Sequence, residues 1–120
     1  MSKIVVVDDS YAELQLIENV LKEAGHTVVS YPNADRLEDK LLVERPDAIM
    51  LDVVMPGRNG YQACRELKAD DRFKHIPLLL CTSKGQQSDK FWGEQQGANA
   101  YIIKPFTAQG LLAALRKVLY

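Results

Sequence analysis

The 120-residue chain lacks the features of a secreted, membrane-spanning or nucleic-acid-binding protein. Its two cysteines, Cys64 and Cys81, are too few for a disulfide framework and lack metal-ligand spacing. We expect both to be buried thiols in a reducing compartment. The apolar runs are far shorter than the ~20 residues that span a bilayer. Residues 1–3 and the short apolar run after them meet two aspartates, which is not the pattern of a secretory signal. A net charge of −1 argues against nucleic acid as a partner. These absences favour a cytoplasmic protein that binds neither nucleic acid nor membrane.

The composition that remains is that of an ordinary soluble domain. Apolar residues make up 47% of the chain and charged residues 26%, which are usual proportions. The length is close to the most common domain size and allows a substantial core. No repeat, linker or low-complexity tract interrupts the chain, so we predict one domain over residues 1–120.

Strand-like and helix-like segments alternate, which predicts an α/β fold with a doubly wound, five-stranded parallel sheet and five helices. The expected strands are residues 4–7, 26–31, 48–51, 78–81 and 100–103. The expected helices run from a cap at Ser10 to a stop at Gly25, then over 34–44, 61–68 and 86–96, and around the leucines of 111–119.

Local patterns refine this expectation. Ser10 and Glu13 match a capping box, in which the hydroxyl and the carboxylate each satisfy a free amide at the helix start. Strand 26–31 is mixed in polarity and is expected at or near a sheet edge. Strand 48–51 is apolar on both faces, as a buried parallel strand should be. Residues 70–77 are expected to form a polar connection.

Polar residues suited to phosphate or metal follow four of the expected strands. They are Asp8 and Asp9, Asp52, Thr82 and Lys104. The carboxyl ends of parallel strands meet at one edge, where open α/β sheets place their sites. Two carboxylates about 4 Å apart repel by roughly 4 kcal/mol at an effective dielectric near 20. A bound cation would offset the repulsion between the acids, and Mg²⁺ favours such oxygen ligands. The set predicts a Mg²⁺-assisted phosphoryl-transfer site.

Lys104 and Thr82 complete this set. A lysine at the end of a buried strand is costly unless its ammonium has a partner, and the acids provide one. With phosphate bound, the ammonium can act as a point charge on a phosphoryl oxygen. A cis bond at Pro105 would aim the lysine inward. The Thr82 hydroxyl is suited to the same phosphoryl group, although Ser83 competes for the role.

The order and spacing of these motifs are similar to those of a known family. The chain resembles the receiver domains of bacterial two-component response regulators, above all the stand-alone chemotaxis type, over essentially its whole length. Thr82 lies 30 residues after Asp52, and Lys104 lies 52 residues after it. These offsets match the family and favour Thr82 over Ser83. The motifs that carry the resemblance are Asp8-Asp9, Leu51-Asp52-Val53-Val54-Met55-Pro56-Gly57, Thr82 and Lys104-Pro105-Phe106.

The resemblance implies a role for each matched residue. Asp52 would accept a phosphoryl group from a histidine kinase, in a flavodoxin-like sheet of strand order 2-1-3-4-5. Asp9, Asp52 and the Val54 carbonyl would ligate Mg²⁺, and Asp8 would help through water. Lys104 would neutralise the phosphoryl group and Thr82 would bond to it. The chain would be a phosphoacceptor and not an enzyme with a separate substrate. Its carboxylate would be ionised at neutral pH and need no general base.

The family also implies a switch and an output. Thr82 would move toward the phosphoryl group and Tyr101 would turn inward, although a half-buried strand aromatic is the simpler interpretation of that tyrosine. Because no effector domain is expected after residue 120, a partner protein would bind the face made by the fourth helix, the fifth strand and the last helix. Phe91 and Trp92 on that fourth helix would either anchor the partner or pack in the core.

Two further patterns concern kinetics and subgroup. Val54, which is apolar, and Lys84 flank the line along which water would attack the phosphoryl group. Because Val54 cannot orient that water, we predict slow self-dephosphorylation. Residues 88–93 are similar to receivers of pilus motility.

Three alternatives use parts of the same pattern. Phosphatases of the haloacid-dehalogenase type carry a second acid two residues after the nucleophile, where this chain has Val54, and they need room for a cap. A flavodoxin-like electron carrier needs a phosphate-cradling loop where this chain has two acids. A receiver that is never phosphorylated would not need the complete set of Asp8, Asp9, Asp52, Thr82 and Lys104.

Overall fold

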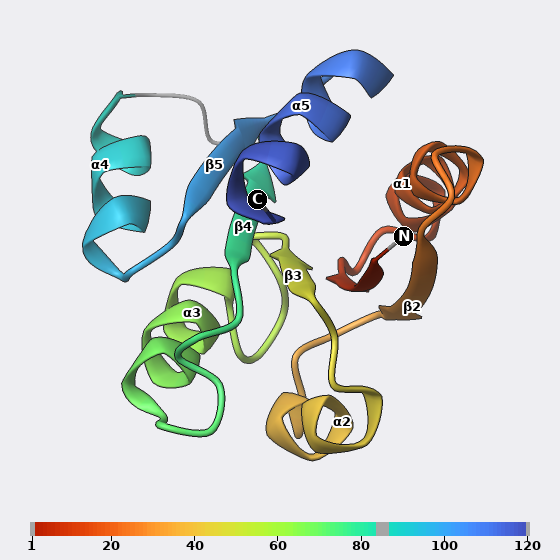
Figure 1. Cartoon of the computed structure of the whole chain (residues 1–120). Helices are drawn as coiled ribbons and strands as arrows, with labels where there is room; N and C mark the ends of the chain where they lie inside the picture. Colours follow the sequence, from red (N-terminus) through yellow and green to blue (C-terminus); the bar gives the residue numbers. More distant parts are fainter. Residues whose placement is uncertain (1, 84–86, 120) are drawn as a thin grey trace.

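The computed structural model describes residues 2–83 and 87–119, with only the main chain for residues 87–90. Strands and helices alternate through the described chain (Figure 1). The strands are β1 (Lys3–Val7), β2 (Thr27–Tyr31), β3 (Ala48–Leu51), β4 (Leu78–Thr82) and β5 (Ala100–Ile103). The helices are α1 (Tyr11–Glu23), α2 (Leu37–Glu44), α3 (Gly60–Ala69), α4 (Gln87–Gln95) and α5 (Ala108–Leu119).

All strand pairs are parallel, and the order is β2-β1-β3-β4-β5. The predicted fold class, strand order and number of helices are confirmed. β2 is an edge strand whose residues are all exposed or only partly buried, as its mixed polarity predicted. β3, at the centre of the sheet, is buried throughout.

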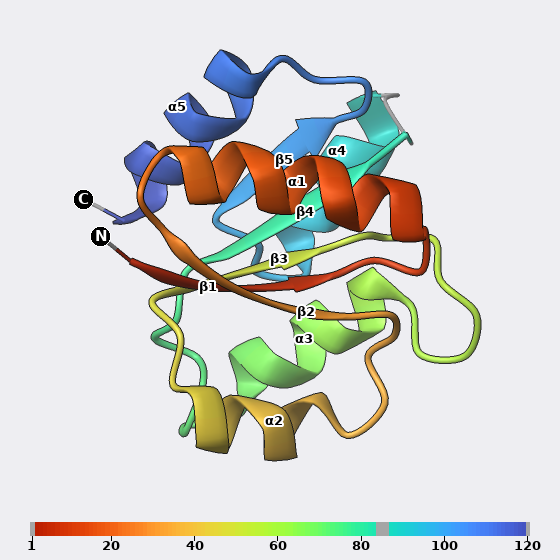
Figure 2. The same cartoon turned by 90° about the vertical axis from the view of Figure 1, so that its right-hand side faces the viewer.

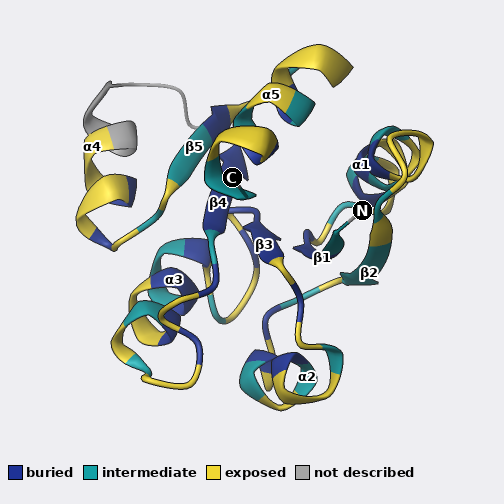
Figure 3. Ribbon diagram, in the orientation of Figure 1, coloured by how far each residue is buried: buried dark blue, intermediate teal, exposed yellow. Residues whose placement is uncertain are grey.

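Two apolar cores lie on opposite faces of the sheet. Figure 2 shows α1 and α5 on one side and α2 and α3 on the other. In β1, Val5 and Val7 belong to the core under α2 and α3, whereas Ile4 and Val6 belong to the core under α1 and α5. Because successive side chains point to opposite faces, a strand covered on both faces is apolar at every position. Figure 3 shows the buried strands and the exposed outer sides of the helices.

The start of α1 differs from the predicted capping box. The Ser10 hydroxyl accepts a hydrogen bond from the Glu13 amide at 3.3 Å, as predicted. The Ser10 amide, however, donates to Asp8 Oδ1 at 2.9 Å and not to Glu13. The reciprocal half of the box is therefore absent, because an aspartate two residues earlier binds the amide that Glu13 would have satisfied.

The second helix was predicted to begin too early. α2 starts at Leu37 and not at residue 34, because the preceding backbone is a turn. The Asn33 side chain accepts the Asp35 amide at 2.9 Å, which is an Asx turn. Arg36 then adopts a left-handed conformation with φ 52°.

The connection between α3 and β4 was predicted to be polar, but Phe73 and Ile76 within it are buried against the core. Phe73 and Ile76 are three residues apart, a spacing that places both side chains on one side of a helical turn. The charged residues around them obscure this pattern in the sequence. Within the part of the chain that the structure describes, no helix is both long enough and apolar enough to cross a membrane.

Candidate functional site

A hollow of about 450 Å³ opens at the carboxyl edge of the sheet. In Figure 2 this is the edge toward which β1 runs and at which α1 begins. Backbone hydrogen bonds from the Asp8 amide to the Tyr31 carbonyl and from the Asp52 amide to the Val7 carbonyl continue the sheet to this edge. The hollow is lined by Asp8, Asp9, Ser10, Glu13, Asp52, Val54, Ser83, Lys104 and Pro105. The edge that the sequence predicted thus contains the three acids and the lysine.

The three aspartates form one cluster. One carboxylate oxygen from each of Asp8, Asp9 and Asp52 lies within 4.8 Å of the others. Asp8 and Asp52 are buried, whereas Asp9 is exposed to solvent. An all-oxygen donor set of this size and charge suits a hard divalent cation such as Mg²⁺. The residues present therefore fit the metal that the sequence predicted.

Lys104 lies among these acids. Its ammonium donates to Asp8 Oδ2 at 2.7 Å and lies 3.8 Å from Asp52 Oδ1 and 4.0 Å from Glu13 Oε2. Burial works to lower the pKa of Lys104, but its hydrogen bond to Asp8 and the charges of Asp8 and Asp52 raise that pKa above its ordinary value. The Lys104–Pro105 bond is cis, as predicted. Lys104 is therefore a positive charge held 3.8 Å from the Asp52 carboxylate.

The Asp52 carboxylate does not have the ordinary pKa that we assumed from the sequence. Burial raises the pKa of Asp52 to about 6, and the charges of Asp8 and Asp9 add to this, while Lys104 opposes it. At pH 7 the group would be roughly nine-tenths ionised, by the ordinary titration relation. It remains mostly ionised at neutral pH, although burial and the neighbouring acids disfavour its charge.

The two hydroxyl residues at the end of β4, Thr82 and Ser83, differ in exposure. The Thr82 side chain is fully buried, whereas Ser83 is exposed and lines the hollow. The Thr82 carbonyl accepts the Lys104 amide at 2.8 Å, which ties the ends of β4 and β5 together. The role of Thr82 at the phosphoryl group stays a prediction. Lys84 lies outside the described residues.

Tyr101 is half-buried in β5 and connects this strand to two helices. Its hydroxyl lies 3.3 Å from the Tyr61 hydroxyl at the start of α3. Its ring lies against Gly93 of α4, where an added Cβ would come within 2.8 Å of the ring. The simpler interpretation, a half-buried strand aromatic, describes its position, and its switching role stays a prediction.

Sequence reasoning missed Glu13 and Tyr61 as neighbours of functional groups. Glu13 approaches Lys104 because its carboxylate is not used in the capping box. Its position one turn into the helix after Asp8-Asp9 was the available signal. Tyr61 had no comparable signal, because its contact with Tyr101 depends on how α3 packs on the sheet.

The aromatic residues of α4 are on the surface. Phe91 is 59% exposed and Trp92 52% exposed, so they do not pack in the core. Ile103 in the adjacent β5 is also exposed. These three residues give the α4–β5 side an apolar surface.

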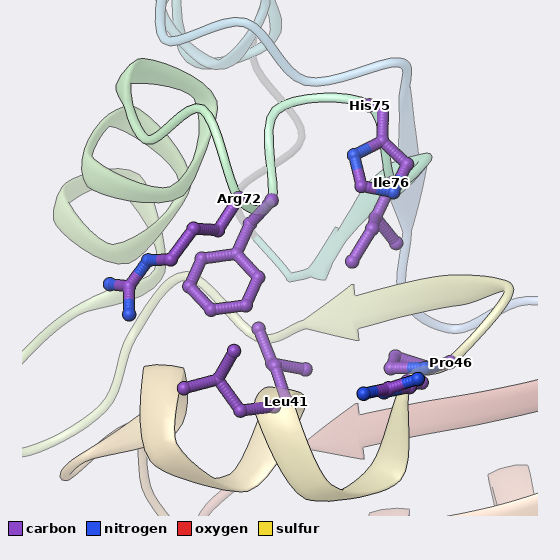
Figure 4. A pocket seen from close by; sticks show the side chains of 8 residues that line it. Leu41, Pro46, Arg72, His75 and Ile76 are labelled. Atoms are coloured by element: carbon purple, nitrogen blue, oxygen red, sulfur yellow. The ribbon is translucent and has the colours of Figure 1, made fainter.

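A second hollow of about 280 Å³ lies at the opposite edge of the sheet, where β3 and β4 begin (Figure 4). Leu41, Phe73 and Ile76 contribute apolar side chains, and Arg45 and His75 contribute basic ones. Among the described residues, no acidic one lines this hollow. It has no part in the acidic site.

Known proteins share both the sequence pattern and this geometry. A model of the family described as response regulator receiver domain matches residues 4–116. Protein PilH of Pseudomonas aeruginosa is 39% identical over 119 residues, which are 99% of this chain and 98% of the relative. The structure of chemotaxis protein CheY4 of Vibrio cholerae has a TM-score of 0.90 at 30% identity and covers 98% of each chain. The receiver domain of sensor histidine kinase PA1611 of Pseudomonas aeruginosa, with a magnesium ion coordinated in its active site cleft, has a TM-score of 0.89 at 28% identity. It covers 98% of this chain and 97% of that one.

Proposed function

Because the chain belongs to the response regulator receiver domain family, we propose that Asp52 is the phosphoacceptor of a signalling switch. Receiver domains take phosphate from histidine kinases and act on downstream targets. The observation that carries the assignment to Asp52 is its place among charges of both signs. It is buried at the end of the central strand, beside two further aspartates and 3.8 Å from the Lys104 ammonium.

Phosphoryl transfer at this site needs positioning and charge stabilisation more than covalent chemistry. A carboxylate oxygen of Asp52 attacks the phosphorus of the donor phosphohistidine. The new P–O bond forms as the P–N bond breaks, and its electron pair returns to the donor imidazole. The product is an aspartyl phosphate on Asp52. The chain assists its own phosphorylation and dephosphorylation and is not an enzyme with a separate substrate.

Asp8, Asp9, Asp52 and the Val54 carbonyl are the groups that would hold Mg²⁺. Receiver domains bind Mg²⁺ at their acidic pocket, and the clustered carboxylate oxygens here suit that ion. When bound, Mg²⁺ neutralises the acids and stabilises charge on the phosphoryl oxygens. Asp8 is already bonded to Lys104, which favours a role for it through water.

Lys104 and Thr82 would bind the phosphoryl oxygens. The Lys104 ammonium is held by Asp8, and Asp52 lies within 4 Å, so a phosphoryl group on Asp52 would come close to it. Thr82 ends the adjacent strand β4 and is buried. Movement of Thr82 toward the phosphoryl group, with Tyr101, is the switch that we propose.

A downstream protein is the proposed reader of that switch. We place its binding surface on α4, β5 and α5, where Phe91, Trp92 and Ile103 are exposed. Large aromatic side chains are frequent anchors of protein interfaces. We propose chemotaxis-like or pilus-motility signalling as the setting of the switch, and the cytoplasm as its location. Slow self-dephosphorylation remains our expectation, since Val54 is exposed at the hollow and offers no polar side-chain group.

Intact-mass measurement after incubation with Mg²⁺ and acetyl phosphate tests the proposal. The unmodified chain should gain one phosphoryl group and the Asp52→Asn variant none. If acetyl phosphate does not react, a phosphorylated histidine kinase replaces it as the donor. Failure of both donors would refute the proposal and leave an unphosphorylated binding module.

A further inference from the structure

Arg58 connects the loop that follows the phosphoacceptor to two helices. The loop, residues 52–59, joins β3 to α3. The Arg58 guanidinium donates from Nε to Glu66 Oε1 at 2.9 Å and from Nη1 to the Ala34 carbonyl at 3.0 Å. It also forms a two-pronged bond with Glu38, from Nη1 at 2.8 Å and from Nη2 at 2.6 Å. One side chain thus fixes the loop to α2, to α3 and to the turn before α2.

This arrangement differs from an ordinary surface ion pair. The Arg58 side chain is only 15% exposed and faces two carboxylates. Two-pronged bonds between arginine and carboxylate are geometrically specific as well as strong. Exposed pairs such as Arg36–Asp39 contribute little, because water screens them. The Arg58 contacts can therefore hold a backbone in place, which a solvated pair does not.

The other end of the loop is fixed at the phosphoacceptor itself. The Gly60 amide donates to the Val53 carbonyl at 2.9 Å. A Cβ on Gly60 would collide with the Asp52 carbonyl oxygen, so the start of α3 lies directly against the acceptor backbone. Met55 is buried in the core under α2 and α3. Between these anchors lies exposed Val54, which lines the acidic hollow.

Arg58 itself is not among the residues that line that hollow. It therefore does not contact the reacting atoms, and its effect on them would pass through the loop backbone. Fixing backbone residues costs conformational entropy. If the Arg58 contacts order the loop when the chain folds, metal binding does not have to order it and loses less conformational entropy.

We propose that Arg58 is a positioning residue that holds residues 53–59 in the conformation required for the Asp52 carboxylate and the Val54 carbonyl to bind Mg²⁺. The inference rests on the proposed function, since it concerns the same site. It assigns a role to a residue outside the motifs that identified the site. A residue that only strengthened the packing of α2 and α3 would change stability without changing metal affinity.

The test compares Arg58→Ala and Arg58→Lys with the matched control Arg36→Ala. Arg36 also pairs with an acid of α2, Asp39, but does so in solvent. Titration calorimetry gives the Mg²⁺ dissociation constant of each protein. Hydrogen exchange of the metal-free proteins gives the protection of residues 53–60 and of the strands.

We expect Arg58→Ala to weaken Mg²⁺ binding on the order of 3- to 10-fold. Exchange should rise at residues 53–60 and stay unchanged in β1 and β3. Arg58→Lys should recover part of the affinity, because one ammonium can replace only some of the four hydrogen bonds. Arg36→Ala should match the unmodified chain in both measurements. If Arg58→Ala does not fold, Glu38→Gln provides a milder change to the same contact and should shift both measurements in the same direction.

Lowered stability of Arg58→Ala with unchanged Mg²⁺ affinity and unchanged loop exchange would overturn the inference. A rise in exchange over the whole sheet would do the same, because it would show a general loss of stability. If the unmodified chain bound no Mg²⁺ and accepted no phosphoryl group, the proposed function would fail. The exchange of the metal-free proteins would still decide whether Arg58 orders the loop.

Discussion

Asp52→Asn should stabilise the metal-free protein, although it removes the residue on which the proposed function depends. Burial and the neighbouring acids raise the pKa of Asp52 from 3.8 to about 6. One pKa unit corresponds to about 1.4 kcal/mol, so ionising Asp52 in the folded state costs up to about 3 kcal/mol. Asparagine has a similar shape and no charge. We expect the free energy of unfolding to rise by roughly 1–3 kcal/mol at pH 7.5.

The sign of the pH dependence follows from proton binding in the two states. Between about pH 4 and pH 6 the native Asp52 keeps a proton that the unfolded chain has lost. The native state then binds more protons, so the stability of the unmodified chain falls as the pH rises through this range. The advantage of Asp52→Asn should therefore be small at pH 4, grow up to pH 6 and stay constant above it.

Urea denaturation in the presence of EDTA, at several pH values, measures this advantage. Asp39→Asn is the matched control, because Asp39 is exposed on α2, and it should change stability by less than about 0.5 kcal/mol. Addition of Mg²⁺ at ten times its dissociation constant should stabilise the unmodified chain by about 1.4 kcal/mol and the Asp52→Asn variant by less. An advantage of equal size at pH 4.5 and pH 7.5, or a loss of stability at both, would refute the reasoning.

Three further changes test other parts of the structure. Lys104→Met should lower the free energy of unfolding by roughly 3 kcal/mol without metal, since it leaves buried Asp8 without its cation; urea denaturation with and without Mg²⁺ should show partial recovery with the ion. Gly60→Ala should cost more than about 2 kcal/mol, because its Cβ would meet the Asp52 carbonyl oxygen; a smaller loss in urea would show that the loop can shift. Phe91→Ala should leave stability within about 1 kcal/mol, because the ring is exposed. The same variant should still be phosphorylated by acetyl phosphate but lose affinity for its downstream protein in a binding titration.

The strands and the charged residues that directly follow them could be predicted, because the order and direction of parallel strands determine where those residues lie. A short apolar run such as Ala48–Leu51, bounded by turn residues and alternating with helical segments, favours a strand covered on both faces. The residue that follows it must then lie at the carboxyl edge of the sheet. Asp52 and Lys104 reach the same hollow for this reason, although 51 residues separate them in sequence. Motif spacing alone did not reveal the raised pKa of Asp52, because that depends on burial.

The supporting groups could not be predicted in the same way, because each depends on one local competition for a hydrogen bond. Glu13 lies near Lys104 only because Asp8 binds the Ser10 amide first. α2 begins late because the residues before it form a turn, in which Asn33 accepts the Asp35 amide and Arg36 is left-handed. The Ala34 carbonyl, in the turn before α2, accepts both the Leu37 amide at 3.3 Å and the Arg58 guanidinium at 3.0 Å. In a helix that began at residue 34, the same carbonyl would instead accept the Glu38 amide. The error in the predicted start of α2 therefore falls on a contact through which, by our inference, the loop is held.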